Sequence, residues 1–232
     1  MSFTAYSNMT MRIHDWKELR GKHAFASPSQ HSWLGLFAKF RKGDFSKDDL
    51  RRAIQDRYAS ARAKEIGTEL HELAERSIAK RIEVPKSRDT IRYMLRMELG
   101  PEKVFFIDNE TIDTFRAYVN DSIHFSMISE VPLKSSEYAF GTSDAIYFDD
   151  KTLKIFDLKT GKSPVPWDQL YIYAAFYCSD YSVDPSDIDI ELRIYQYGKF
   201  VTEKPDPKII RQIMEDTKFL TEVIDDIKPE RR

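Results

Sequence analysis

Residues 141–161 read GTSDAIYFDDKTLKIFDLKTG, and this stretch decides the expected fold. Apolar and polar residues alternate on either side of Asp149-Asp150. That alternation predicts strands over 138–148 and 153–158, and the Asp pair predicts the turn between them. The stretch is therefore expected to form an antiparallel hairpin.

The hairpin carries two carboxylates and a lysine. Asp144 and Asp157 fall on its neighbouring strands, so both can reach the same end of a sheet. Hard oxygen ligands of this kind suit Mg²⁺ or Mn²⁺. Lys159 stands two residues past Asp157 and is expected on the same face of the strand. A lysine beside a bound cation has a lowered pKa and can hold or deprotonate an attacking water.

The hydrophobic periodicity divides the chain into a helical first part, up to about residue 124, and a strand-rich part over 126–200 followed by a last helix. Gly100-Pro101 is typical of a helix C-terminus, and Asp206-Pro207 of a helix start. From residue 109 the expected order is helix, three strands, helix, strand and helix. The expected helices lie after Ser29, from Ser46 to Ile78, through Ile91–Leu95 and Ile112–Ile123, from Asp168 to about Ser179 and after Asp206; the expected strands span 127–133, 138–148, 153–158 and 188–195.

Composition excludes several classes of protein. The 232 residues are 41% hydrophobic, too many for a disordered chain, and 36 basic against 38 acidic residues leave a net charge of −2. Any nucleic-acid contact must therefore come from a local patch. The single cysteine, Cys178, excludes a disulfide framework and a cysteine-ligated iron–sulfur cluster. With no glycine-rich phosphate loop, no long apolar run and no signal peptide, we expect a cytoplasmic protein without a nucleotide cofactor or a membrane partner.

Three motifs stand in order along the chain: Gly141 with Asp144, Asp157 with Lys159, and Gln169 with Tyr173. This pattern resembles the PD-(D/E)XK nuclease superfamily, in particular its RecB and lambda-exonuclease-like branch. The motifs of that branch read G-x-x-D, then D-x-K-T-G or E-x-K, then Q-x-x-x-Y on the following helix.

The resemblance covers roughly residues 109–200 and one helix upstream. It implies an α/β (α+β) fold with a restriction-endonuclease-like core of order α-β-β-β-α-β, in which helices flank a mixed sheet. We expect this nuclease core over 109–232. A helical region over 1–108, which includes His71, is expected to pack on the core and to cap its cleft.

An upstream pair extends the resemblance, because Gly67 and His71 match the G-x-x-x-H of the RecB-like branch. The resemblance implies that one or two Mg²⁺ or Mn²⁺ ions bind the side chains of His71, Asp144 and Asp157 and the backbone carbonyl of Leu158. A glycine inside a helix costs about 1 kcal/mol relative to alanine. Such a glycine is easier to understand if the backbone passes close to another segment.

The resemblance implies a role for several other residues, and each of them also has an ordinary structural explanation. Glu130 would help to hold a second ion, or it lies on a solvated sheet face. Gln169 would contact water or the scissile phosphate, or it is an ordinary residue at a helix N-terminus. Tyr173 would contact DNA, or it packs its helix. Arg57, Arg62 and Lys64, in a basic run with Arg51 and Arg52, would line a DNA channel, or they form a solvated helix face.

The resemblance thus implies a stand-alone, metal-dependent DNA exonuclease of phage-recombination or genome-maintenance type. Its partners would be linear DNA ends and a recombination or replication protein, in the host cytoplasm if a phage encodes it. Lys159 would activate the water, with Asp144, Asp157 and Gln169 as the other catalytic residues. The alternatives are a non-catalytic nucleic-acid-binding subunit on the same fold and an RNA endonuclease.

Overall fold

The computed structural model describes residues 34–149 and 151–227. The described residues fall into two compact units, which divide between Tyr58 and Ala59. The division expected between residues 108 and 109 stays a prediction. The helix expected after Ser29 appears as α1, Leu34–Arg41, although Ser29 lies outside the described residues.

Helix α2, Lys47–Ala79, runs from the first unit into the second. Its start is fixed by a reciprocal cap, because the Asp49 backbone N–H donates to Ser46 Oγ over 3.1 Å and the Ser46 backbone N–H donates to Asp49 Oδ2 over 3.0 Å. The predicted helix start near Ser46 is confirmed.

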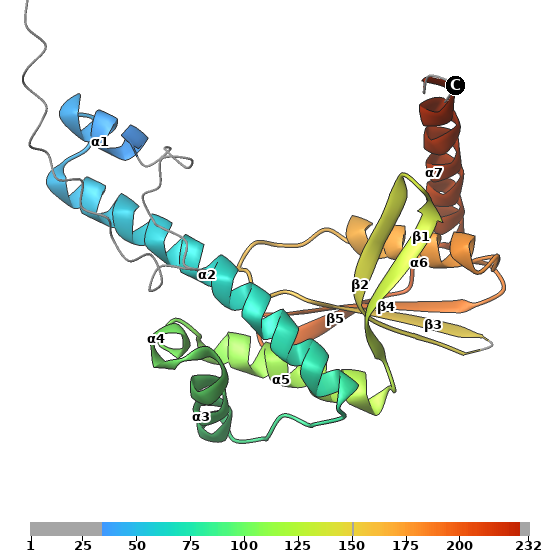
Figure 1. The fold of residues 1–232 in the computed structure, drawn as a ribbon, viewed down its shortest axis with the longest axis horizontal. Helices are drawn as coiled ribbons and strands as arrows, with labels where there is room; N and C mark the ends of the chain where they lie inside the picture. Colours follow the sequence, from blue (N-terminus) through green and yellow to red (C-terminus); the bar gives the residue numbers. More distant parts are fainter. Residues whose placement is uncertain (1–33, 150, 228–232) are drawn as a thin grey trace, which may run out of the picture. The chain divides into compact units, whose positions relative to one another are not determined.

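The second unit is a mixed α/β fold in which helices flank a five-stranded sheet (Figure 1). The strands lie in the order β1-β2-β3-β4-β5, with β3 and β4 parallel and all other neighbours antiparallel. The parallel pair requires a crossover, which α6 supplies. The remaining elements are α3 (Arg88–Leu99), α4 (Pro101–Val104), α5 (Asn109–His124), β1 (Ile128–Ser136), β2 (Ala139–Phe148), β3 (Thr152–Leu158), α6 (Asp168–Asp180), β4 (Asp189–Gln196), β5 (Lys199–Glu203) and α7 (Pro207–Ile227).

Each face of the sheet has its own apolar core. On one face, residues of α2 to α5 such as Leu70 and Ile112 pack with Phe156. On the other, α6 and α7 pack with Ile155. Strand β3 thus contributes neighbouring residues to both cores, so its apolar residues run together and depart from the alternation expected for it.

Local signals fix several helix ends, among them the predicted stop at Gly100-Pro101 and the predicted start at Asp206. Gly100, at φ +92°, follows α3, and Pro101 begins α4. The carboxylate of Asp108 accepts the Thr111 backbone N–H over 2.8 Å and so caps α5. Asp206 Oδ1 accepts the Lys208 backbone N–H over 2.9 Å, which confirms the predicted start of α7.

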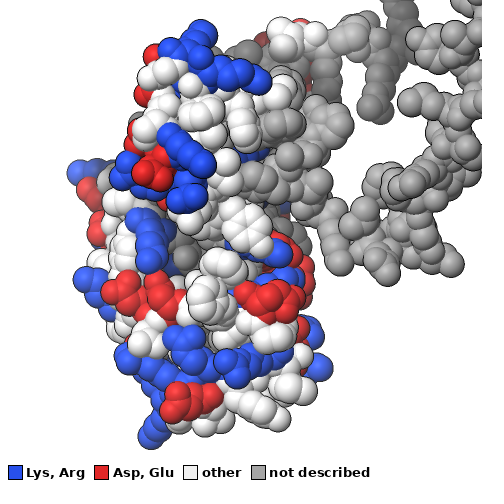
Figure 2. Space-filling model, turned by 90° about the vertical axis from the view of Figure 1, so that its left-hand side faces the viewer, with Lys and Arg blue, Asp and Glu red and all other residues white. Residues whose placement is uncertain are grey.

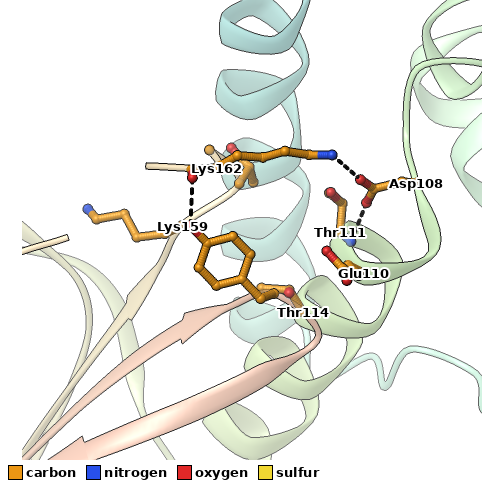
Figure 3. A pocket seen from close by; sticks show the side chains of 9 residues that line it. Asp108, Glu110, Thr111, Thr114, Lys159 and Lys162 are labelled. Atoms are coloured by element: carbon orange, nitrogen blue, oxygen red, sulfur yellow. Dashed lines mark hydrogen bonds and ion pairs between the residues drawn. The ribbon is translucent and has the colours of Figure 1, made fainter. Parts of the chain in front are cut away.

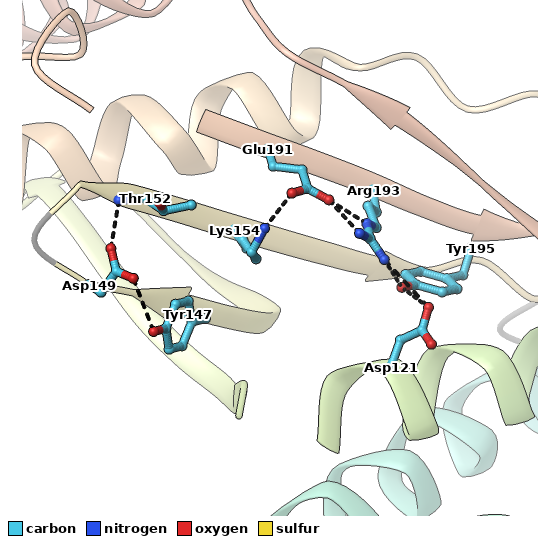
Figure 4. A network of polar contacts seen from close by, with 8 residues as sticks. All are labelled: Asp121, Tyr147, Asp149, Thr152, Lys154, Glu191, Arg193 and Tyr195. Carbon is cyan, nitrogen blue, oxygen red and sulfur yellow. Dashed lines mark hydrogen bonds and ion pairs between the residues drawn. The ribbon is translucent and has the colours of Figure 1, made fainter. Parts of the chain in front are cut away.

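A polar network joins α5 to the strands β3 and β4 (Figure 4). Lys154 and Arg193 both bind the carboxylate of Glu191. Arg193 also pairs with Asp121 of α5 over 3.5 Å, and the Tyr195 hydroxyl donates to the same carboxylate over 2.8 Å. These contacts fix α5 against the sheet.

The turn predicted at Asp149-Asp150 is present and is built by Asp149, while Asp150 lies outside the described residues. Asp149 Oδ1 accepts the backbone N–H groups of Lys151 and Thr152 over 3.0 and 2.9 Å, and its Oδ2 accepts from the Tyr147 hydroxyl (Figure 4). The carboxylate of Asp149 therefore serves the turn.

The order predicted from residue 109 onward was wrong in one respect, because strand β5 was not expected; before residue 109, the short helix α4 was not expected either. Tyr197 and Gly198, at φ +56° and +73°, form a two-residue turn that pairs Gln196 with Lys199. Such a turn suits a hairpin. Strand β5 lies at the edge of the sheet and most of its residues are exposed, so its sequence needs no apolar pattern of its own.

No helix in the described ranges is both long enough and apolar enough to cross a membrane.

Candidate active site

The strand register places two carboxylates side by side. Ala145 on β2 pairs with Phe156 on β3. One further step along this antiparallel register puts Asp144 opposite Asp157. Residues directly opposite each other on neighbouring strands have Cβ atoms about 4.5–5.5 Å apart. The predicted juxtaposition of the two carboxylates on the hairpin is therefore present.

Glu130 extends the row onto a third strand. It lies between Ser129 and Val131, which pair with Ala145 and Ser143, so Glu130 is opposite Asp144. Its φ is +52°, in the left-handed region that is costly for a residue with a side chain. Partial removal from water, then the charges of Asp144 and Glu75, raise the pKa of the Glu130 carboxyl. The Glu130 carboxyl therefore interacts with the charge of Asp144 and forms a row of three acids with Asp144 and Asp157.

Asp157 is the most deeply buried acid of the row, with only 2% of its surface exposed. Its Oδ1 accepts from Lys159 Nζ over 2.8 Å, whereas its Oδ2 is buried without a hydrogen-bond partner. Burial and the nearby charge of Asp144 raise the pKa of the Asp157 carboxyl to about 7, against the opposing effect of Lys159. A buried carboxylate oxygen without a partner is costly, and a cation would satisfy it.

Asp144 is held from two sides. Its Oδ2 accepts the backbone N–H of Leu158 over 3.0 Å, which ties it to the end of β3. His71 Nδ1, from α2, lies 3.5 Å from the same oxygen. The structure therefore brings the predicted ligands His71 and Asp144 together, with Leu158 beside them.

Gly67 explains how α2 comes so close to the sheet. A Cβ atom added at Gly67 would lie 2.7 Å from Thr160 Oγ1, well inside contact distance. The helix backbone thus passes directly against the segment that follows β3, as the glycine suggested. His71, one helical turn later, is thereby carried to Asp144.

Lys159 lies between β3 and α6. Its Nζ donates to Asp157 Oδ1 over 2.8 Å and to Gln169 Oε1 over 3.0 Å. Gln169 lies in the first turn of α6, and its Nε2 donates to the Tyr173 hydroxyl over 3.2 Å. All three sequence motifs are thus in contact with one another.

The carboxylates and the histidine do not form one closed ligand cage. Within residues 34–149 and 151–227, no group of three or more His, Cys, Asp or Glu side chains is arranged to hold a metal ion. Instead, His71 pairs with Asp144, and Asp157 pairs with Lys159. The chemistry of these donors still fits a hard divalent cation. A cation would give the buried Asp157 Oδ2 the partner that it lacks.

A small hollow lies beside the site, between α5 and the segment after β3 (Figure 3). Lys162 closes it with an ion pair to Asp108 over 2.9 Å, and the Tyr197 hydroxyl donates to the Lys162 carbonyl over 2.6 Å. The side chain of Lys159 points away from Lys162 (Figure 3). The hollow is therefore a neighbour of the site and not the place to which Lys159 is directed.

The basic residues of α2 are interleaved with acids. Arg62 pairs with Glu65 over 2.7 Å, one turn along the helix, and Lys64 is exposed. Arg57 lies on the part of α2 that belongs to the first unit, where Arg51 and Arg52 pair with Asp48 and Asp49. Figure 2 shows the same mixture of Lys and Arg with Asp and Glu across one face. Arg62 is therefore paired within its own helix, and the DNA channel along Arg57, Arg62 and Lys64 stays a prediction.

Two residues near the site were not predicted. Glu75 lies four residues after His71 on α2, so the helical repeat alone could have indicated that it shares the face of His71. Tyr118 of α5 is 2% exposed, and burial, followed by the charges of Asp144, Asp157 and Glu130, raises its pKa well above the usual value. Nothing in the sequence separates Tyr118 from the apolar stripe of its helix.

A family model described as "Protein of unknown function (DUF2800)" matches residues 46–196. The matched range begins at the cap of α2 and ends with β4, so it contains every site residue described above. No curated protein matches the chain.

Proposed function

The chain belongs to the DUF2800 family, and we propose that it is a metal-dependent nuclease that hydrolyses DNA phosphodiester bonds. The observation that carries this proposal is the closeness of Asp144 and Asp157 at one end of β2 and β3: Asp144 accepts the backbone N–H of Leu158, and its charge acts on the Asp157 carboxyl, which binds Lys159. These residues belong to the first two of the three ordered motifs, and Gln169 with Tyr173 forms the third; together the motifs favour a PD-(D/E)XK core of the RecB-like exonuclease kind.

The metal would be held by His71, Asp144, Asp157 and the carbonyl oxygen of Leu158. The buried Asp157 Oδ2 without a partner supports this set, because a cation would offset the cost of burying it. When bound, Mg²⁺ or Mn²⁺ supplies neutralisation of the phosphoryl oxygens and makes water a stronger nucleophile. Glu130, in line with Asp144, would assist a second ion.

Lys159 would act on the attacking water. An ammonium group has three N–H donors, and in the described structure two of them bind Asp157 Oδ1 and Gln169 Oε1. The third is left for a water or for a phosphoryl oxygen of the substrate. Nζ would thus orient the water and, when deprotonated, accept its proton, while Asp157 and Gln169 keep the amine in place.

A digestion experiment tests the proposal. End-labelled linear DNA and a closed circle of the same sequence are incubated with Mg²⁺, with Mn²⁺ and with excess EDTA, beside an RNA of matching sequence. We expect the linear DNA to be degraded with either metal, the closed circle to be spared, and EDTA to stop the reaction.

The other outcomes contradict distinct parts of the proposal. Full activity in EDTA would exclude metal dependence, and rapid cutting of the closed circle would indicate an endonuclease. Preferential loss of RNA would favour an RNA endonuclease. Tight binding of DNA ends without cleavage under any metal would favour a non-catalytic binding subunit.

A further inference from the structure

A chain of hydrogen bonds connects the middle of α6 with the proposed catalytic lysine. The Tyr173 hydroxyl accepts from Gln169 Nε2 over 3.2 Å, Gln169 Oε1 accepts from Lys159 Nζ over 3.0 Å, and Nζ also donates to Asp157 Oδ1 over 2.8 Å. The side chains of Asp157 on β3, Lys159 in the segment after it, and Gln169 and Tyr173 on α6 are therefore connected by consecutive hydrogen bonds.

The direction of these bonds depends on the Gln169 amide. One end of the amide is an acceptor and the other a donor, and the two ends have nearly the same shape. If the amide turned over, its N–H₂ group would face the ammonium of Lys159, donor against donor. The Lys159 ammonium can only donate, so it keeps Oε1 turned toward itself. The Tyr173 hydroxyl accepts from Nε2 and so holds the other end of the amide in place.

Gly141 in turn fixes the position of the Tyr173 ring. A Cβ atom at Gly141 would lie 3.1 Å from Tyr173 Cε1 and 3.9 Å from the hydroxyl oxygen. The glycine therefore leaves room for the ring to pack against the backbone of β2, three residues before Asp144. This packing gives Gly141 and Tyr173 a shared structural purpose.

We infer that Tyr173 is a positioning residue that orients Lys159 through Gln169, rather than a residue that contacts DNA. The inference rests on the proposed function, since it assigns a role within that same site. Gln169 touches the catalytic amine, and Tyr173 acts only through Gln169. The lack of a side chain at Gly141 leaves the space that the Tyr173 ring needs.

The substitution Tyr173→Phe tests the inference, because it keeps the ring against Gly141 and removes only the hydroxyl. The matched control is Tyr171→Phe on the same helix, whose hydroxyl donates to Glu203 Oε1 over 3.1 Å outside the relay. We expect Tyr173→Phe to lower the single-turnover rate at saturating DNA by about 2- to 12-fold, the value of one neutral hydrogen bond. Calcium-supported DNA affinity should be unchanged, and Tyr171→Phe should change neither quantity.

The coupling between the residues gives a second readout. If Tyr173 acts through Gln169, adding Tyr173→Phe to Gln169→Ala should lower the rate no further than Gln169→Ala alone. Independent effects that multiply would overturn the inference. So would a Tyr173→Phe variant whose DNA affinity falls while its rate at saturation stays normal, since that result indicates a DNA contact.

A spectroscopic readout keeps the inference separate from the proposed function. The Gln169 side-chain amide signal in a nitrogen–proton correlation spectrum, identified by its loss in Gln169→Ala, should shift in Tyr173→Phe and in Lys159→Ala but not in Tyr171→Phe. An unshifted signal in Tyr173→Phe would overturn the relay even in an active enzyme. A wild-type protein that cleaves nothing would overturn the proposed function, while the signal would still report on the relay.

Discussion

Replacing Gly67 with alanine sets two effects of opposite sign against each other. Alanine favours the interior of a helix over glycine by about 1 kcal/mol. Its Cβ, however, would lie 2.7 Å from Thr160 Oγ1, so the helix or the segment after β3 must move by about 0.7 Å to reach the 3.4 Å of ordinary contact. Overpacking of this kind costs roughly 1–3 kcal/mol. The expected net loss of stability is therefore small, from near zero to about 2 kcal/mol.

The effect of Gly67→Ala on activity should be larger than its effect on stability. The displaced contact lies one helical turn from His71 and next to Lys159, and a misplacement of about 1 Å can cost about 10²-fold in rate. Removing Thr160 Oγ1 should relieve the clash, because the next atom, Thr160 Cβ, is 3.9 Å away. In a Thr160→Ala background, Gly67→Ala should thus leave the rate unchanged and stabilise the fold by about 1 kcal/mol.

Urea unfolding and single-turnover cleavage of the four proteins in this double-mutant cycle measure both effects. Gly35→Ala is the matched control, because a Cβ atom at Gly35 of α1 would meet nothing within 4 Å. An equal loss of activity from Gly67→Ala in the presence and in the absence of Thr160→Ala would refute the reasoning. Full activity with increased stability in the protein that retains Thr160 would do the same.

Three further predictions concern the chemistry of the site. Lys159→Ala should lower kcat and kcat/KM together by about 10²- to 10⁴-fold and leave calcium-supported DNA affinity unchanged. Lys159→Arg should not restore the rate. A Lys159→Ala variant whose only defect is weaker DNA affinity would contradict this role. Asp144→Asn should abolish cleavage, whereas Asp149→Asn, in the turn, should retain it; equal loss in both folded variants would mean that the roles of the two acids are misassigned. Mg²⁺ or Mn²⁺ should support cleavage while Ca²⁺ binds without turnover, as a titration of each ion against cleavage rate would test.

Much of the fold was predictable because the deciding signals are local. The hairpin, the cap at Ser46 and the break at Gly100-Pro101 depend on neighbouring residues, and all three are confirmed. Strand β5 was missed because an exposed edge strand needs no apolar alternation. Its Gly198 turn was the one available signal.

The sequence predicted which residues lie at the candidate site, but not the hydrogen bonds between them. The motif spacing selects Asp144, Asp157 and Lys159, and the register then places the acids opposite each other. The bonds from Lys159 to Gln169 and from Gln169 to Tyr173 depend on how α6 packs on the sheet, which is a tertiary property. The buried, partnerless oxygen of Asp157 likewise follows from packing and not from its neighbours in sequence.

The central claim is that Asp157 belongs to a metal-dependent hydrolytic site, and one comparison tests it most directly. Single-turnover cleavage of end-labelled linear DNA is measured in Mg²⁺ for the wild type and for Asp157→Asn, with circular dichroism to establish that both are folded. We predict cleavage by the wild type and a fall of at least about 10²-fold in the variant, because several kcal/mol of transition-state charge stabilisation depends on this carboxylate. Equal rates in the two folded proteins, or a wild type that is inert in both Mg²⁺ and Mn²⁺, would contradict the claim.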